Sequence, residues 1–115
     1  MKVLYLISTM EPHSGRGGHY YSLRTTAEEM SKKLDCAIVV IGKRESPVIN
    51  QSKVKTYNLI YKKINIIKVI KDLKNIIDIE RPQVIHSFDE DTFFFGSLIS
   101  NILKKPYIHT KCGGP

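Results

Sequence analysis

Residues 3–8 of the chain read VLYLIS, an apolar run without a charged side chain. A strand with one solvent-exposed face alternates apolar and polar residues, whereas a strand buried on both faces of a parallel sheet is apolar throughout. The run therefore predicts a central strand of a parallel sheet.

Helical and strand-like segments alternate after this run. Apolar residues spaced by three and four predict helices over about residues 18–34, 64–80 and 91–103, the last beginning at a cap from Asp89 or Asp91. Apolar runs predict strands over residues 37–41, 84–88 and 107–110, with a less regular strand over 54–60 and an exposed loop over 43–52. In the middle helix, the residues expected to face the core are Ile66, Ile67, Ile70, Leu73 and Ile77. This order predicts a Rossmann-like α/β fold: a mostly parallel sheet of about five or six strands with helices on both faces.

The bulk composition is that of one folded domain. The chain has 115 residues, of which 42% are hydrophobic and 25% charged. No stretch reaches the ~18 apolar residues of a membrane span, and the first strand is too short for a signal peptide, so we expect a cytoplasmic domain. Cys36 and Cys112 lie in separate apolar segments, which favours buried free thiols over a disulfide.

The net charge of +7 predicts attraction to polyanions, which include phosphorylated small molecules, anionic lipid and nucleic acid, and the charge alone does not choose among them. Much of the excess lies between Lys62 and Lys74, where lysines flank an apolar stripe. This pattern is typical of a solvated helix face, and the alternative is a peripheral contact with the inner face of a membrane. Nucleic acid is not expected as a partner because the chain carries no recognition motif for it.

A glycine-rich loop follows the first strand and runs into a helix, whose free N–H groups and dipole favour an anion. The alternative is that the glycines only permit a tight turn. Neither the dinucleotide fingerprint nor the Walker A pattern is complete here, so the interpretation is a substrate-binding loop of another kind. Its candidate binding residues are Gly15, Arg16, Gly17, Gly18 and His19.

Polar residues also follow the strand predicted over residues 84–88. His86 and Asp89 are candidate catalytic residues, because an imidazole and a carboxylate there can bind sugar hydroxyls or hold a base. The alternatives are a core histidine and a helix cap. The histidines and Cys112 have no recognised metal-ligand spacing, so no metal site is expected.

Three segments together resemble the N-terminal domain of glycosyltransferase family 4. They are the Gly17 and Gly18 pair, residues 81–89 (RPQVIHSFD) and residues 105–115 (KPYIHTKCGGP). The resemblance implies a retaining, metal-independent GT-B enzyme that uses a nucleotide sugar as co-substrate and no other cofactor. In such an enzyme the N-terminal domain binds a glycan or lipid-linked acceptor, and the C-terminal domain binds most of the donor.

The resemblance also implies roles for individual residues. Gly17 and Gly18 match the loop near the donor phosphates, and His86 and Asp89 match the pair at the fourth strand. Thr110 matches the last strand motif and is a candidate for substrate binding. Cys112 takes the place of a frequent histidine and is the third catalytic candidate, although a thiol does not reproduce the hydrogen bonding of an imidazole.

The resemblance covers the whole chain, and no part of the chain corresponds to a second Rossmann-like domain. We therefore expect residues 1–115 to be the N-terminal half of a GT-B enzyme, catalytically incomplete in isolation and able to self-associate through an exposed inter-domain face. The alternative is a stand-alone Rossmann-like module that binds a phosphorylated ligand or nucleotide.

Overall fold

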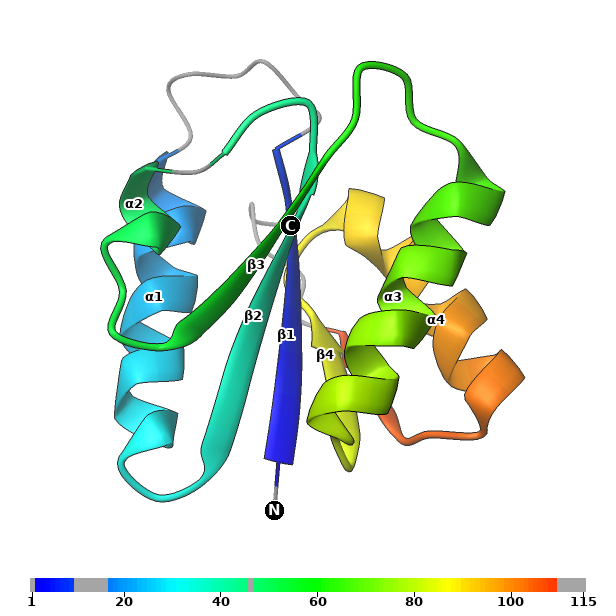
Figure 1. Cartoon of the computed structure of the whole chain (residues 1–115). Coiled ribbons are helices and arrows are strands. Elements are labelled where there is room, and N and C mark those ends of the chain that lie inside the picture. The colour runs from blue at the N-terminus through cyan, green and yellow to red at the C-terminus, as the bar shows by residue number, and fades with distance from the viewer. Residues whose placement is uncertain (1, 10–16, 46, 110–115) are drawn as a thin grey trace.

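The computed structural model describes residues 2–9, 17–45 and 47–109, which form an α/β domain around one sheet (Figure 1). The strand order is β3-β2-β1-β4-β5, and every neighbouring pair is parallel. This arrangement confirms the Rossmann-like class. The elements are β1 (Lys2–Thr9), α1 (Gly17–Ser31), β2 (Asp35–Gly42), α2 (Pro47–Asn50), β3 (Lys55–Ile60), α3 (Ile66–Glu80), β4 (Val84–Ser87), α4 (Glu90–Leu103) and β5 (Tyr107–His109).

Strand β1 lies at the centre of two hydrophobic cores, one on each face of the sheet. Leu4 and Leu6 pack in the core beneath α3 and α4, whereas Tyr5 and Ile7 pack in the core beneath α1 and α2. Figure 1 shows α1 and α2 on one side of the sheet and α3 and α4 on the other. Because successive side chains of a strand point to opposite faces, a strand covered on both sides must be apolar at every position.

The segment between β2 and β3 differs from the exposed loop predicted over residues 43–52. It contains the one-turn helix α2, and Ile49 of this helix is fully buried in the core shared with Leu23 and Ala27 of α1. The prediction was wrong because one adjacent pair of apolar residues, Val48 and Ile49, carries no periodicity in a polar segment, while a crossover between parallel strands must pass over a face of the sheet.

The buried stripe of α3 also differs from its prediction. Val69, Leu73, Ile76 and Ile77 face the core, whereas Ile66 is 49% exposed and Ile67 is 80% exposed. Ile67 lies about a third of a turn away from the buried stripe, and Ile66 stands in the first turn of the helix. The helix has six isoleucines in fifteen residues, so the sequence is compatible with more than one buried face. Packing against the sheet determines which face is buried.

A buried carboxylate joins three elements at the end of the sheet where the strands begin. Glu80, the last residue of α3, has a 3% exposed side chain and forms ion pairs with Lys2 Nζ at 2.5 Å and Lys55 Nζ at 2.8 Å. The Tyr57 hydroxyl also donates a hydrogen bond to it. The bond from Lys2, followed by those from Lys55 and Tyr57, lowers the pKa of Glu80 from 4.5 to about 2. Its stabilising contribution is therefore complete above pH 4.5 and is lost as the pH falls towards 2.

We predict that Glu80→Gln lowers the free energy of unfolding at pH 7 by about 2 kcal/mol, since the charged partners of Lys2 and Lys55 are removed. The difference from wild type should shrink as the pH falls from 5 and vanish near pH 2, as measured by urea unfolding across this range. Glu29→Gln is the matched control, because the Glu29–Lys32 pair is about two-thirds exposed and contributes little. A pH-independent difference would contradict an electrostatic role for Glu80.

A glycine lets α4 approach the edge strand β5. A Cβ atom at Gly96 would lie 2.6 Å from Cε1 of the Tyr107 ring. The ring has little room to move, because its hydroxyl bonds Ser87 Oγ and also donates to the Phe93 carbonyl at 3.3 Å. Phe93 stacks on the same ring, with centroids 6.1 Å apart. Contact of helix and strand here requires a residue without a side chain.

Gly96→Ala should lower the free energy of unfolding by about 1–2 kcal/mol, because the added methyl group would clash with the Tyr107 ring. This loss is expected although alanine has a higher helix propensity than glycine. In a Tyr107→Leu background, the same substitution should be neutral or stabilising, because the clashing ring is gone. A double-mutant cycle by chemical denaturation measures the coupling. Equal effects in both backgrounds would show that the ring does not set the requirement for glycine.

Candidate functional site

The carboxyl edge of the sheet is the end at which the strands finish, at Thr9, Gly42, Ile60, Ser87 and His109. The chain proceeds outward in one direction from β1 to β3, and in the other from β4 to β5, so the connections diverge between β1 and β4. Ligands of open parallel sheets bind at such a point. The candidate site therefore lies above the ends of β1 and β4.

Helix α1 begins at this edge. Gly17, Gly18 and His19 form its first turn, directly after the loop that follows β1. The first N–H groups of a helix have no partner within the helix and attract negative charge. The helix therefore begins at the glycines of the predicted loop, and anion binding there stays a prediction. Gly15, Arg16, Thr110 and Cys112 lie outside the described residues.

The carboxylate of Asp89 ties the start of α4 to the end of β1. Its Oδ1 accepts hydrogen bonds from Thr92 N–H at 2.9 Å and Thr92 Oγ1 at 2.7 Å, which makes it the N-cap of α4. Its Oδ2 accepts a hydrogen bond from Ser8 N–H at 2.7 Å. One side chain therefore caps α4 and holds its first turn against the end of β1.

These hydrogen bonds show which of the two predicted residues caps α4. They also bear on the prediction that Asp89 is catalytic. Asp89 is the cap, whereas Asp91 accepts a hydrogen bond from Ser8 Oγ at 3.4 Å. Both oxygens of Asp89 already bond groups of the chain, so its primary effect on a ligand is to position Ser8 and the start of α4. A catalytic role for Asp89 stays a prediction. The structural contribution of Ser8 and Thr92 was missed, because Ser8 is 81 positions from Asp89 and an aspartate cap by itself signals only where a helix begins.

His86 lies on the face of the sheet that α1 covers, in register with Tyr5 on one side and Ile108 on the other. Its ring centroid is 5.2 Å from that of Tyr5 and 5.5 Å from that of Phe88. The side chain is half-buried. An aromatic setting of this kind fixes the orientation of the imidazole, and its catalytic role stays a prediction.

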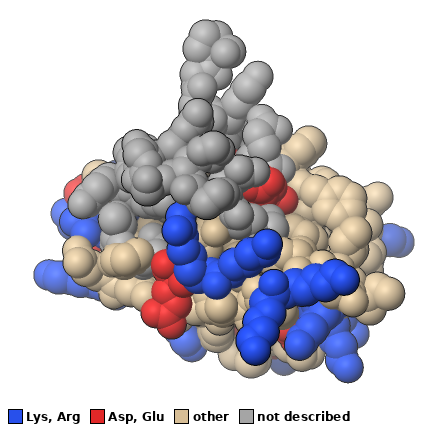
Figure 2. Space-filling view, turned by 90° about the horizontal axis from the view of Figure 1, so that it is seen from above, with Lys and Arg blue, Asp and Glu red and all other residues tan. Residues whose placement is uncertain are grey.

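Basic residues gather on the other half of the carboxyl edge. Lys43 and Arg44 follow β2, Lys62 and Lys63 follow β3, and all four are exposed. The Thr9 hydroxyl donates a hydrogen bond to the Arg44 carbonyl, which joins this loop to the end of β1. Figure 2, which looks down on this edge, shows several basic side chains along it. The edge is therefore cationic beside β2 and β3 and acidic near α4, where Asp89 and Asp91 lie.

Other kinds of site are less well supported. Within residues 2–9, 17–45 and 47–109, no group of three His, Cys, Asp or Glu side chains is placed to hold a metal ion. Cys36 is a free, half-buried thiol. In the same part of the chain, none of the helices combines the length and apolarity needed to cross a bilayer.

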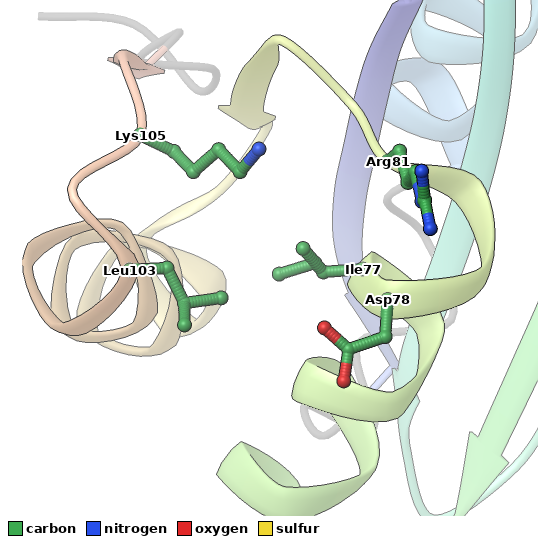
Figure 3. A pocket seen from close by; sticks show the side chains of 5 residues that line it. All are labelled: Ile77, Asp78, Arg81, Leu103 and Lys105. Atoms are coloured by element: carbon green, nitrogen blue, oxygen red, sulfur yellow. The ribbon is translucent and has the colours of Figure 1, made fainter.

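A pocket of about 420 Å³ lies at the opposite end of the molecule, between the C-terminal ends of α3 and α4 (Figure 3). Ile77 and Leu103 point towards each other across it, and Asp78, Arg81 and Lys105 complete its lining. Arg81 and Lys104 are the C-caps of the two helices, where positive charge complements the helix dipole. The cations at this end therefore have a structural explanation, and none of the predicted site residues lies there.

A parallel sheet with helices on both faces, whose connections diverge between β1 and β4, defines a Rossmann-like domain. The family model described as glycosyl transferase 4-like matches residues 2–115, and the chain belongs to this family. No curated protein matches the sequence.

Asp89→Asn should lower the free energy of unfolding by about 1–2 kcal/mol, because an amide cannot accept from both Ser8 N–H and Thr92 N–H. Urea unfolding at pH 7 measures the effect. The matched control is Asp78→Asn on the exposed side of α3, which should change stability by no more than about 0.5 kcal/mol. Wild-type stability for Asp89→Asn would show that the carboxylate does not hold the start of α4 to the end of β1.

Proposed function

We propose that this chain is the acceptor-side, N-terminal domain of a retaining glycosyltransferase. The enzyme transfers a sugar from a nucleotide-sugar donor to a glycan or lipid-linked acceptor. The observation that carries the proposal is the glycosyl transferase 4-like match over residues 2–115, which spans every described element of the fold. The position of Gly17, Gly18 and Asp89 at the carboxyl edge supports it.

Charge considerations assign roles to the two halves of this edge. In the transfer, the bond between the sugar and the diphosphate breaks, a bond to the acceptor oxygen forms, and the acceptor hydroxyl loses its proton. Negative charge develops on the leaving diphosphate, and a helix N-terminus with nearby cations stabilises such charge. We assign this part to the start of α1 at Gly17 and Gly18, together with Gly15, Arg16 and His19, and to the flank formed by Lys43 and Lys62.

The acidic half of the edge suits the acceptor. Carboxylates and imidazoles bind sugar hydroxyls through hydrogen bonds. In the proposed enzyme His86 contacts the acceptor or the transferred sugar, and Asp89 holds the loop between β4 and α4 in place for that contact. Thr110 and Cys112 complete the substrate-binding residues. The nucleotide sugar is a co-substrate, and the proposed reaction uses no metal ion.

The described residues form one Rossmann-like domain, whereas a GT-B active site is a cleft between two. We therefore propose that residues 1–115 bind ligands weakly and do not catalyse transfer unless a second domain supplies the other wall. Tight nucleotide binding by the chain alone would instead favour a stand-alone phosphate-binding module.

The proposal predicts where ligands perturb the molecule. In a ¹⁵N-HSQC titration of the 115-residue chain with UDP, GDP and their sugar conjugates, amides of Gly17, Gly18 and Lys43 should shift at millimolar ligand. Lys43→Gln should weaken this binding roughly threefold, because one cation near a diphosphate is removed. Lys105→Gln, at the opposite end of the sheet, is the control and should have no effect.

Two outcomes would contradict the proposal. Sugar transfer catalysed by the 115 residues alone would refute the division into two domains. The absence of any shift at the carboxyl edge with all of these ligands, and with oligosaccharide acceptors, would refute the site.

A further inference from the structure

The pocket between the C-terminal ends of α3 and α4 contains a cation that is not part of a helix cap. The caps account for the backbone positions of Arg81 and Lys104. Lys105 is not a cap, yet its half-buried side chain lies along the pocket (Figure 3). The volume of about 420 Å³ falls in the range of roughly 300–1,000 Å³ that is usual for small-molecule sites.

Hydrogen bonds fix the backbone that carries the two cations of the pocket. Arg81 has a left-handed backbone with a φ of 50°, and its N–H donates to the Ile77 carbonyl at 2.7 Å. The Lys105 N–H donates to the Ser100 carbonyl at 2.9 Å, and the carbonyl of Pro106 accepts a hydrogen bond from β4 at 3.0 Å. The cations therefore stand on defined backbone, one at the end of α3 and the other just after α4.

One carboxylate and two apolar side chains complete the pocket. Ile77 is 3% exposed, Leu103 is half-buried, and the two point towards each other. The Asp78 carboxylate lies beside them on α3. Within the described residues, none of Asp78, Arg81 and Lys105 forms an ion pair with another side chain. The pocket therefore offers two cations, one carboxylate and an apolar surface to a ligand.

We propose that this pocket binds a free α-amino acid with an aliphatic side chain. The carboxylate of the ligand bonds Arg81, whose planar guanidinium can donate two parallel hydrogen bonds to it, and Lys105 is the second cation. The ammonium faces Asp78 and the C-terminal ends of α3 and α4, which carry partial negative charge. The aliphatic side chain packs on Ile77 and Leu103.

Charge complementarity favours this ligand over simpler ones. An aliphatic acid would leave Asp78 without a partner, and an aliphatic amine would leave Arg81 and Lys105 without an anion. An α-amino acid carries both charges on one carbon atom, next to a side chain that can lie on the apolar lining. The pocket is at the opposite end of the sheet from the carboxyl edge, so this proposal does not depend on the transfer reaction.

The test is a ¹⁵N-HSQC titration of the 115-residue chain with L-leucine near neutral pH. Amides of the lining residues should shift at millimolar leucine, because so small a ligand in an open pocket binds weakly, and amides of Gly17 and Lys43 should not shift. Glycine, which lacks the aliphatic group, should bind roughly tenfold more weakly. Isocaproate and isoamylamine keep that group but each lack one charge, and each should bind about threefold more weakly than leucine.

Two substitutions test the assigned contacts. Asp78→Asn should weaken leucine binding roughly three- to fivefold, whereas isocaproate, which has no ammonium, should bind as well as before or more tightly. Lys105→Gln should weaken both leucine and isocaproate about threefold. Lys74→Gln is the matched control, because this exposed lysine lies one turn before Asp78 on α3 and outside the pocket lining. Its leucine binding should match wild type, and circular dichroism checks that every variant is folded.

Three results would overturn the proposal. The first is the absence of shifts at the lining residues with leucine. The second is leucine binding that neither Asp78→Asn nor Lys105→Gln weakens. The third is isocaproate binding as tight as that of leucine, which would assign the pocket to simple carboxylic acids and leave Asp78 without a role.

Discussion

Burial of β1 on both faces is the constraint on which the rest of the domain depends. β1 pairs with β2 along its whole length and with β4 on the other side, and its side chains enter both cores in alternation. Helices must cover both faces to remove these side chains from water, and right-handed crossovers then determine on which face each helix lies. The divergence of the chain at β1 and β4, and with it the candidate site, is a consequence of this central strand.

The two ends of the sheet have different polar chemistry. Where the strands begin, Glu80 is buried between Lys2 and Lys55, and its charge joins three elements of the fold. Where they end, Asp89 also joins elements through Ser8 and Thr92, which are both buried, and the basic residues Lys43 and Lys62 are exposed. Each end therefore carries a carboxylate that joins elements of the fold, and exposed positive charge lies beside the carboxyl ends of β2 and β3.

Much of this architecture could be predicted because it depends on local patterns. Uniform apolar runs identified the buried strands, and the spacing of Leu23 and Ala27 identified α1. The errors arose where local pattern was uninformative. Ile49 and its neighbour Val48 form only one apolar pair in a polar segment. In α3 the many isoleucines allow more than one buried stripe, so that Ile67 was wrongly expected in the core.

The sequence by itself determined the class of fold, the family and the residues that follow each strand, because each of these follows from local composition and order along the chain. Only the tertiary structure decided that Asp89 bonds Ser8 across 81 positions, that Glu80 meets Lys2 and Lys55, and that Ile67 faces water. These facts depend on which surfaces meet when the helices pack on the sheet. A side chain's neighbours across the sheet, and hence its burial and partners, are set by that packing and not by its neighbours in sequence.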